Sequence, residues 1–334
     1  MQTTHAVHAR DARELSLPAD SVDLVVTSPP YPMVEMWDES FAAQDPAIGE
    51  ALDAEDGDRA FELMHDLLDE VWGRLPEVVR PGGIVCVNVG DATRSVEGFT
   101  QYPNAAEITR RMREHGFRPL PDILWRKPTN SRTKFMGSGM VPTNAYPTLE
   151  HEHILVFRNG TTRSFPAGDR RRYESAYFWE ERNEWFSDLW EIRGEQQALA
   201  TGDRDRSGAF PFEIPHRLIR MFSVYEDTVL DPFWGTGTTT VAAMVAGRSS
   251  VGYERDAGLV EGFDPASVPD LATRVTEGRL EAHREFLEER EGGGEYPADH
   301  YDFDVVTNQE SGIRLYDIAA LDGDGPWTAQ YEPV

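Results

Sequence analysis

Cysteine and lysine are almost missing from this chain of 334 residues. It has one cysteine, Cys86, and two lysines, Lys127 and Lys134. A single cysteine excludes an intramolecular disulfide and any cysteine-rich metal cluster. No uncharged apolar run approaches the ~20 residues that a membrane-spanning helix needs, and the sequence does not open with a basic and then apolar leader. We therefore expect a cytoplasmic protein without a membrane segment.

The scarcity of lysine accompanies a large excess of acidic residues. Asp and Glu number 59 against 32 Lys and Arg, which gives a formal net charge of −27. Such acidity argues against a nucleic-acid partner, because phosphate contacts normally need Lys and Arg. It is also typical of a halophilic surface, since in molar salt the Debye length is ~3 Å and self-repulsion is screened. Composition leaves both interpretations open.

Positive charge is concentrated in one part of the chain. Residues 105–172 hold 13 basic and six acidic residues, whereas the rest is strongly acidic. This concentration suggests a face for an anionic partner. The alternative is a chance cluster on ordinary helix and strand surfaces.

Short apolar runs alternate with amphipathic stretches along the sequence. The runs predict buried strands at 22–27, 84–89, 118–125, 153–157, 229–230 and 250–253. The amphipathic stretches predict helices at 60–78, 105–115, 238–246 and from 257 to 290. Strands separated by helices indicate an α/β fold with a doubly wound, mostly parallel sheet. Near the end, we expect a small hairpin of 304–307 with 313–316.

The first chemical motif is Thr27-Ser28-Pro29-Pro30-Tyr31, which follows a predicted strand. Doubly wound folds bind ligands at this end of their strands. The two prolines fix φ and remove two backbone donors, so that carbonyls, a hydroxyl and an aromatic ring remain. This set suits a planar substrate that carries an amino group. The ring would stack on the substrate, and the oxygens would bind its amino group. A rigid turn without chemistry could use the same prolines.

The second motif, residues 231–240, reads DPFWGTGTTT and lies between a strand and a helix. Gly235 and Gly237 allow close backbone approach, and the helix N-terminus offers free N–H groups. No lysine follows the glycines, which excludes a phosphate-binding P-loop. Glu254 lies at the end of the next strand and can accept ribose hydroxyls, while Asp231 can meet an ammonium group. A ligand that has an amine and a ribose but no pyrophosphate is indicated, and S-adenosylmethionine is such a ligand.

Together the two motifs resemble those of the amino-methylating DNA methyltransferases. The catalytic motif precedes the cofactor motif, as in the β group, which is a circularly permuted order. Supporting segments are Arg10–Ala12, Arg80–Gly83, Phe210–Ile219 and Gly247–Glu254. The resemblance covers roughly residues 5–260 and implies a Rossmann-like S-adenosylmethionine-dependent methyltransferase with an inserted target-recognition region.

The resemblance implies roles for individual residues. The catalytic motif would be Ser28, Pro29, Pro30 and Tyr31. The residues expected to hold S-adenosylmethionine are Asp11, Asp231, Phe233, Gly235, Thr236, Gly237, Thr238 and Glu254. The residues expected to contact DNA phosphates or guanine edges are Arg132, Lys134, Arg170, Arg171 and Arg172. The chemistry needs no metal.

The resemblance also implies a division of the chain. Residues 1–127 would form the catalytic half, and 128–210 would hold a mobile loop, a core strand and the target-recognition region. Residues 211–260 would form the cofactor-binding half, and 261–334 a C-terminal helix and small tail.

The implied activity is methyl transfer to N4 of a cytosine that has been extruded from double-stranded DNA. Serine at position 28 resembles N4-cytosine enzymes, whereas aspartate there usually accompanies N6-adenine, which is the alternative. An RNA or protein amine methyltransferase and a non-catalytic DNA-binding protein are more remote. Methylation at C5 is excluded because Cys86 lies between valines in a predicted buried strand. Residues 31–38 and 178–183 resemble archaeal members, some associated with CTAG sites, and a cognate restriction enzyme would be a partner.

Overall fold

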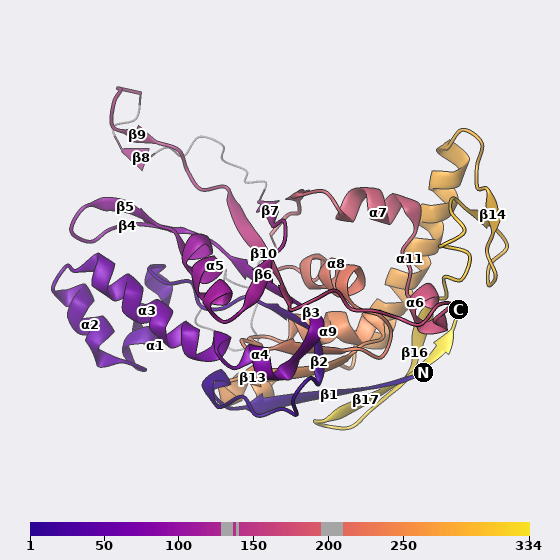
Figure 1. The fold of residues 1–334 in the computed structure, drawn as a ribbon, viewed down its shortest axis with the longest axis horizontal. Coiled ribbons are helices and arrows are strands. Elements are labelled where there is room, and N and C mark those ends of the chain that lie inside the picture. The colour runs from indigo at the N-terminus through magenta and orange to yellow at the C-terminus, as the bar shows by residue number, and fades with distance from the viewer. Residues whose placement is uncertain (128–135, 138–139, 195–209) are drawn as a thin grey trace.

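The protein is seen here as a computed structural model that describes residues 1–127, 136–137, 140–194 and 210–334 (Figure 1). Within these residues, eleven strands form one sheet, in the order β11-β7-β10-β3-β2-β12-β13-β1-β17-β16 with β6 on β10. The five central strands are parallel to one another. They are β3 (Val79–Val89), β2 (Val22–Thr27), β12 (Thr228–Asp231), β13 (Ser249–Glu254) and β1 (Gln2–Ala9).

Antiparallel strands extend the parallel centre at both ends. On one side, β10 pairs with β3, β7 pairs with β10, and β11 pairs with β7 in parallel. On the other side, β17 pairs with β1 and β16 with β17. The bounds of these strands are β6 Phe117–Pro119, β7 Ile123–Arg126, β10 His151–Asn159, β11 Leu189–Glu191, β16 Tyr316–Asp322 and β17 Trp327–Pro333.

Helices cover both faces of the sheet. The apolar runs of the central strands supply both cores, because successive side chains point to opposite faces. On β2, Val25 packs into the core shared with α3 (Gly57–Trp72) and α5 (Asn104–Glu114). Its neighbour Val26 packs into the core shared with α8 (Glu213–Phe222) and α9 (Thr238–Ala246). The predicted doubly wound, mostly parallel α/β fold is therefore confirmed.

The remaining elements lie around this centre. Short helices are α1 Asp38–Ala42, α2 Pro46–Asp53, α4 Leu75–Val78, α6 Arg170–Glu174, α7 Trp179–Trp185 and α10 Ala257–Glu261. The long helix α11 spans Val268–Glu289. Two-stranded ribbons are β4 (Ala92–Ser95) with β5 (Phe99–Tyr102), β8 (Met136–Gly137) with β9 (Ala145–Tyr146), and β14 (Tyr296–Pro297) with β15 (Asp304–Val305).

Two sequence expectations differ from the structure at the ends of the chain. The sequence predicts no strand at residues 2–9, yet they form β1 inside the main sheet. The predicted hairpin of 304–307 with 313–316 is wrong, since β15 pairs with β14 and β16 pairs with β17. The tail finds partners in β1, more than three hundred residues away, so local turn signals misplace it.

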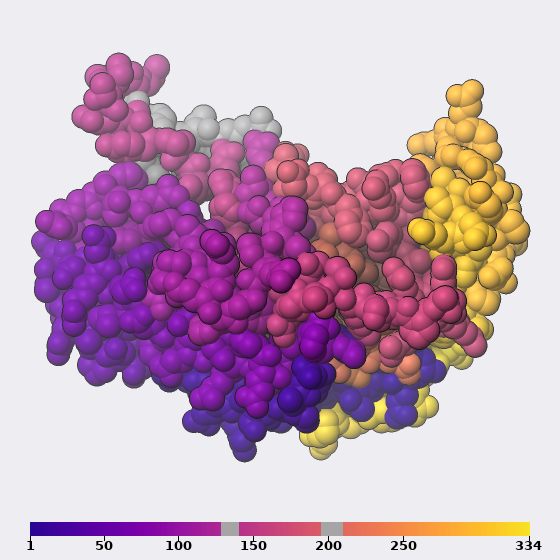
Figure 2. All heavy atoms as spheres, in the orientation of Figure 1, coloured from indigo at the N-terminus to yellow at the C-terminus, as the bar shows by residue number. Residues whose placement is uncertain are grey.

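The molecule has a hollowed upper side in the view of Figure 2. One projection carries β8 and β9, and the other carries the end of α11 with β14. No helix among the described residues is both long and apolar enough to cross a lipid bilayer.

Candidate active site

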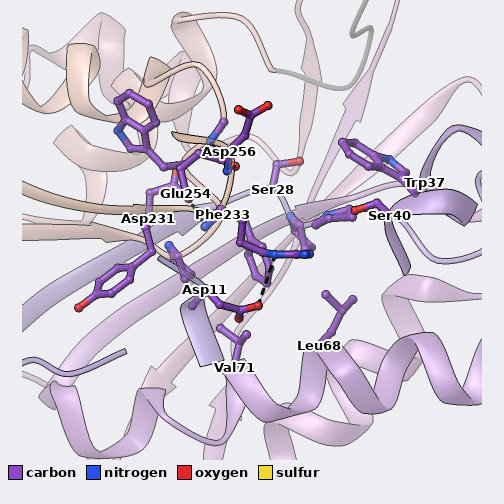
Figure 3. Close-up of a pocket in the computed structure, with 18 of the residues that line it drawn as sticks. Asp11, Ser28, Trp37, Ser40, Leu68, Val71, Asp231, Phe233, Glu254 and Asp256 are labelled. Atoms are coloured by element: carbon purple, nitrogen blue, oxygen red, sulfur yellow. Dashed lines mark hydrogen bonds and ion pairs between the residues drawn. The ribbon is translucent and has the colours of Figure 1, made fainter. Parts of the chain in front are cut away.

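A cavity of about 420 Å³ lies at the carboxyl ends of β2, β12 and β13. It brings together the two sequence motifs, which are about two hundred residues apart. All four predicted catalytic residues line it, as do seven of the eight predicted cofactor residues. Those seven are Asp11, Asp231, Phe233, Gly235, Thr236, Thr238 and Glu254. Figure 3 shows residues of both motifs, among them Ser28, Asp231 and Glu254, around one space with Leu68 and Val71 of α3.

Gly237 is the predicted cofactor residue that is not part of the cavity wall. It has φ +86, a backbone conformation that L side chains rarely adopt. A Cβ placed there would lie 2.7 Å from ring carbons of both Phe263 and Trp234. Gly237 therefore allows the tight turn between β12 and α9, and this turn brings Gly235 to the cavity.

Glu254 closes the glycine turn from the neighbouring strand. One carboxylate oxygen accepts from the Gly235 N–H at 2.8 Å, and the other accepts from the Asp256 N–H at 2.9 Å. The two backbone bonds fix the carboxylate at the cavity wall. Each carboxylate oxygen has further acceptor capacity for hydroxyl groups of a ligand.

Asp231 is a buried acid at the end of β12. Its Oδ1 accepts from the Thr27 hydroxyl at 2.6 Å and from the Phe233 N–H at 3.1 Å. Burial raises the pKa of Asp231 to about 6, and the nearby charge of Glu254 adds to this rise. Its bond to Thr27 ties the cofactor motif directly to the residue that precedes Ser28. A cationic ligand would stabilise the ionised form of this carboxyl group.

Asp11 follows β1, the strand that pairs with β13, and it lines the same cavity as Asp231 and Glu254 (Figure 3). It accepts from the backbone N–H of Arg13 at 2.9 Å and from its guanidinium at 2.9 and 3.0 Å. Burial would raise the pKa of Asp11, but the hydrogen bonds and charge of Arg13 outweigh burial and lower it. A fixed carboxylate at this wall can accept a hydrogen bond from a ligand amine.

The Ser-Pro-Pro-Tyr segment contributes a polar network as well as a wall. The Ser28 and Tyr31 hydroxyls are 3.0 Å apart, and the Tyr31 hydroxyl donates to a Glu152 carboxylate oxygen at 2.9 Å. The Asn88 amide donates to the Tyr31 oxygen at 2.8 Å and to the same Glu152 oxygen at 2.7 Å. Lys127 donates to the other oxygen of Glu152. Sequence reasoning missed Asn88 and Glu152, because nothing local marks strand residues that meet only across β3 and β10.

The apolar wall opposite the glycine turn was also missed. Leu68 and Val71 project into the cavity from α3, and Trp37 and Ser40 from the segment before it (Figure 3). The helical periodicity of α3 was visible in the sequence. It could not show that one edge of its buried face lines a cavity while the rest lies in the core.

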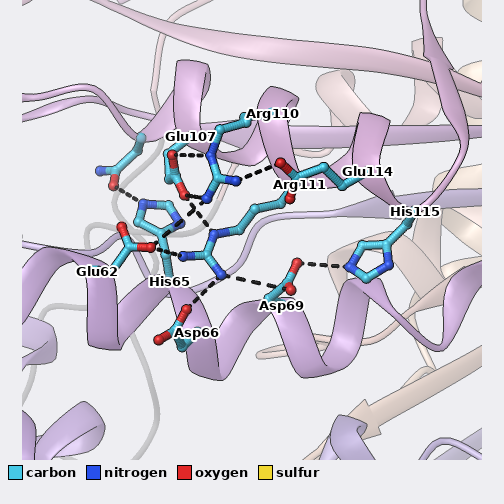
Figure 4. Close-up of polar contacts among 10 residues, drawn as sticks. Glu62, His65, Asp66, Asp69, Glu107, Arg110, Arg111, Glu114 and His115 are labelled. Carbon is cyan, nitrogen blue, oxygen red and sulfur yellow. Dashed lines mark hydrogen bonds and ion pairs between the residues drawn. The ribbon is translucent and has the colours of Figure 1, made fainter.

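Several basic residues of the cluster at 105–172 are paired with acids of the protein itself. Figure 4 shows Arg110 and Arg111 of α5 among the acids of α5 and α3. Arg111 bonds to Glu107 of its own helix and to Glu62 and Asp66 of α3. Arg126 and Lys127 are likewise paired with acids. The charges of these four residues are therefore balanced within the protein, and the expected face for an anionic partner stays a prediction for the rest of the cluster.

The predicted DNA contacts are not brought to the cavity in the described residues. Arg132 and Lys134 lie outside the described residues. Arg170–Arg172 lie on α6, which ends at Glu174. The hydroxyl of the next residue, Ser175, accepts from the Tyr225 N–H just before the amino end of β12. The cavity opens at the opposite, carboxyl end of that strand. The assignment of Arg170–Arg172 to DNA stays a prediction.

The polar and apolar groups that line the cavity fit S-adenosylmethionine. The carboxylates of Asp11, Asp231 and Glu254 suit an adenine amine, an ammonium group and ribose hydroxyls, while Phe233 and Val71 offer apolar surface. Within the described part of the chain, no group of three or more His, Cys, Asp or Glu side chains could hold a metal ion. Cys86 is fully buried in β3, and burial raises the pKa of its thiol.

Comparisons with known proteins match this geometry. A family model described as DNA methylase, of the N6/N4 amino-methyltransferase type, matches residues 22–264. The Type II methyltransferase M.MthZI of Methanothermobacter thermautotrophicus is 47% identical over 95% of this chain and 91% of its own. M.MjaI of Methanocaldococcus jannaschii is 48% identical over 77% and 89%. A putative DNA modification methylase of Thermus thermophilus, solved with S-adenosyl-L-methionine, is 34% identical, with a TM-score of 0.60 over 77% of this chain and 93% of its own.

Proposed function

Because the chain belongs to the N6/N4 amino-methylating family of DNA methylases and uses S-adenosylmethionine, we propose that it methylates N4 of cytosine in double-stranded DNA. The observation that carries this proposal is the junction of the two motifs in one cavity. There the Thr27–Asp231 hydrogen bond joins the strand end that carries Ser28 to the cofactor loop.

The cofactor, when bound, supplies the methyl group. Asp231 and Glu254 would hold its ammonium group and ribose, and Asp11 its adenine amine. Phe233 and Val71 would pack against its apolar parts. Thr236 and Thr238 line the same wall near the start of α9. The fixed hydrogen bonds of Glu254 and Asp11 support these roles, because neither carboxylate has to reorient on binding.

Catalysis in this proposal depends on positioning rather than on a covalent enzyme intermediate. The target cytosine must leave the duplex, because its N4 is paired there. The Tyr31 ring stacks on the extruded base, and the Ser28 oxygen and Pro29 carbonyl accept its amino hydrogens. This arrangement directs the nitrogen lone pair towards the methyl donor.

Serine at position 28 supports N4-cytosine over N6-adenine, which is the alternative product. For the target sequence we propose CTAG, on the likeness of residues 31–38 and 178–183 to archaeal enzymes. The two relatives named as Type II methyltransferases support a restriction enzyme of the same specificity as partner. Contacts to DNA by Arg132, Lys134 and Arg170–Arg172 belong to the same proposal.

One experiment tests the proposal. The protein is incubated in high KCl with labelled S-adenosylmethionine and DNA of varied sequence, and the methylated nucleoside is identified by mass spectrometry. N4-methylcytosine is expected, and Ser28→Ala should abolish or strongly reduce it while leaving cofactor affinity unchanged. N6-methyladenine would overturn the N4 assignment, and full activity of Ser28→Ala would overturn the active-site assignment.

A further inference from the structure

The hydroxyl of Ser28 belongs to a chain of hydrogen bonds that ends at an ion pair. The chain runs from Ser28 through the Tyr31 hydroxyl to Glu152, whose other oxygen accepts from Lys127. The Tyr31 side chain is nearly fully buried, and the side chains of Glu152 and Lys127 are 13% and 32% exposed. The chain therefore passes from the cavity wall across the neighbouring strands β3 and β10 to the surface.

The chemistry of the two end groups fixes the direction of every bond in this chain. Lys127 can only donate, and the carboxylate of Glu152 can only accept. Tyr31 has one hydroxyl hydrogen, and it is donated to Glu152. The Ser28 hydroxyl must then donate to Tyr31. The Asn88 amide approaches one lone pair of the Ser28 oxygen at 3.5 Å, and the other lone pair is left for the cavity.

Asn88 reinforces this direction. Its amide nitrogen donates to both Tyr31 and Glu152, while its oxygen is buried with no hydrogen-bond partner among the described residues. If the Asn88 amide were flipped by 180°, its oxygen would lie beside the Tyr31 hydroxyl and could accept from it. The same oxygen would also lie against the Glu152 carboxylate, which can only accept. Glu152 therefore also decides which way the Asn88 amide faces.

Lys127 is notable because the chain uses arginine at every basic position except two. An ammonium donates from one point, whereas a guanidinium tends to engage both oxygens of a carboxylate. A lysine at 127 leaves the second oxygen of Glu152 to Tyr31 and Asn88. It also lies 4.4 Å from the ring centroid of Trp125, which restricts its position.

We propose that the Lys127–Glu152 pair is a positioning device for the reaction, which makes the Ser28 oxygen an obligatory acceptor for the target amine. This inference rests on the proposed function and extends it to two residues outside both sequence motifs. Glu152 and Lys127 act through Tyr31 and Ser28 and do not touch the reacting atoms.

The decisive test compares Glu152→Gln with the double variant Glu152→Gln/Lys127→Met. In the single variant, Lys127 donates to the oxygen of the new amide, so the amide N–H₂ faces Tyr31. Nothing then imposes the direction of the hydrogen bonds between Tyr31 and Ser28. We expect kcat to fall ~10- to 100-fold, with KM for DNA and the affinity for S-adenosylmethionine nearly unchanged. In the double variant, the amide can turn its oxygen back to Tyr31, and most of the lost kcat should return.

A purely structural role for the ion pair predicts the opposite order, with the double variant no better than Glu152→Gln. That order, or wild-type kcat in Glu152→Gln, would overturn the proposal. The matched control is Glu150→Gln, which removes a carboxylate paired with Arg126 at 3.5 Å and should leave kcat unchanged. Tm is measured for every variant.

Tyr31→Phe keeps the proposal testable if Glu152→Gln does not fold. It keeps the ring for stacking and removes the middle hydroxyl of the chain, so kcat should fall at least ~10-fold with little change in KM. Wild-type kcat in Tyr31→Phe would refute the chain. Failure of the proposed function itself is distinguishable, since the wild-type protein would then leave the DNA amine unmethylated.

Discussion

Replacing Asp231 by asparagine should stabilise the protein while it weakens cofactor binding. The hydrogen bonds from Thr27 and Phe233 both go to Oδ1, which an asparagine can also present. The Thr239 hydroxyl also bonds to the carboxyl group, and it can accept from an asparagine amide instead of donating. The substitution therefore removes a buried charge and keeps the bonds from Thr27 and Phe233. A gain in stability on removal of a buried charge is expected only where that charge is retained for function at the expense of stability.

The size of this effect follows from the pKa of Asp231, which burial raises from 3.8 to about 6. Because the folded-state pKa is the higher one, the wild-type protein loses stability as pH rises through about 4 to 6. Linkage with these two values gives a penalty of about 1.5 kcal/mol at pH 5 and about 3 kcal/mol at pH 8. The amide of the Asp231→Asn variant does not titrate. The difference in free energy of unfolding between the two proteins should therefore grow by about 1.5 kcal/mol from pH 5 to pH 8.

Urea denaturation of both proteins at pH 5, 6, 7 and 8, at one KCl concentration, measures this difference. The variant should be the more stable protein throughout, with an advantage that increases with pH and levels off above about 7. A variant that is less stable at pH 8, or an advantage independent of pH, would refute the assignment of a buried charge to Asp231.

Cofactor binding gives an independent check on the same residue. If Asp231 faces the ammonium group, the wild-type affinity for S-adenosylmethionine should rise between pH 5 and 7 as the carboxyl ionises. The variant should bind more weakly and lose this dependence, as measured by isothermal titration calorimetry. Equal affinity in both proteins at pH 8 would remove Asp231 from the ammonium site.

Two further substitutions test the glycine turn. Glu254→Gln keeps an acceptor for only one of its two backbone donors, so we expect about tenfold weaker S-adenosylmethionine binding, or ~1.4 kcal/mol, with DNA affinity retained in a gel-shift assay. Unchanged cofactor affinity would exclude its ribose role. Gly237→Ala forces a positive φ on alanine and a clash with Phe263 and Trp234, which should cost ~2 kcal/mol or more in thermal denaturation; a wild-type Tm would contradict the turn geometry.

Much of the fold could be predicted because its elements carry local signals. The helix predicted at 238–246 coincides with α9, since glycines bound it on both sides. The predicted helix 60–78 is divided into α3 and α4 near Pro76, as its proline implies. The predicted strand 118–125 is two strands, β6 and β7, and this division depends on their separate pairings with β10.

The residues of the candidate site likewise include some that could be predicted from local signals and some that could not. Residues in contiguous motifs, such as Ser28 and Glu254, could be found because the chain itself sets their spacing. Glu152 and Leu68 could not, because their place at the site depends on how β10 and α3 pack in three dimensions. The pairing of Arg111 could not be predicted for a related reason, since its acidic partners include side chains of α3, outside the span over which charge was counted.

The position of β1 has a consequence for how the protein is made. β1 has no partner nearby in sequence, because His5 pairs with Ser250 on one side and with Trp327 on the other. More than three hundred further residues must be synthesised before both edges of β1 are covered, and such long-range pairing folds slowly. Nascent chains that stall before β17 would expose an unpaired strand edge, which is a template for aggregation. Synthesis of β17 therefore covers the edge of the sheet that β1 leaves open.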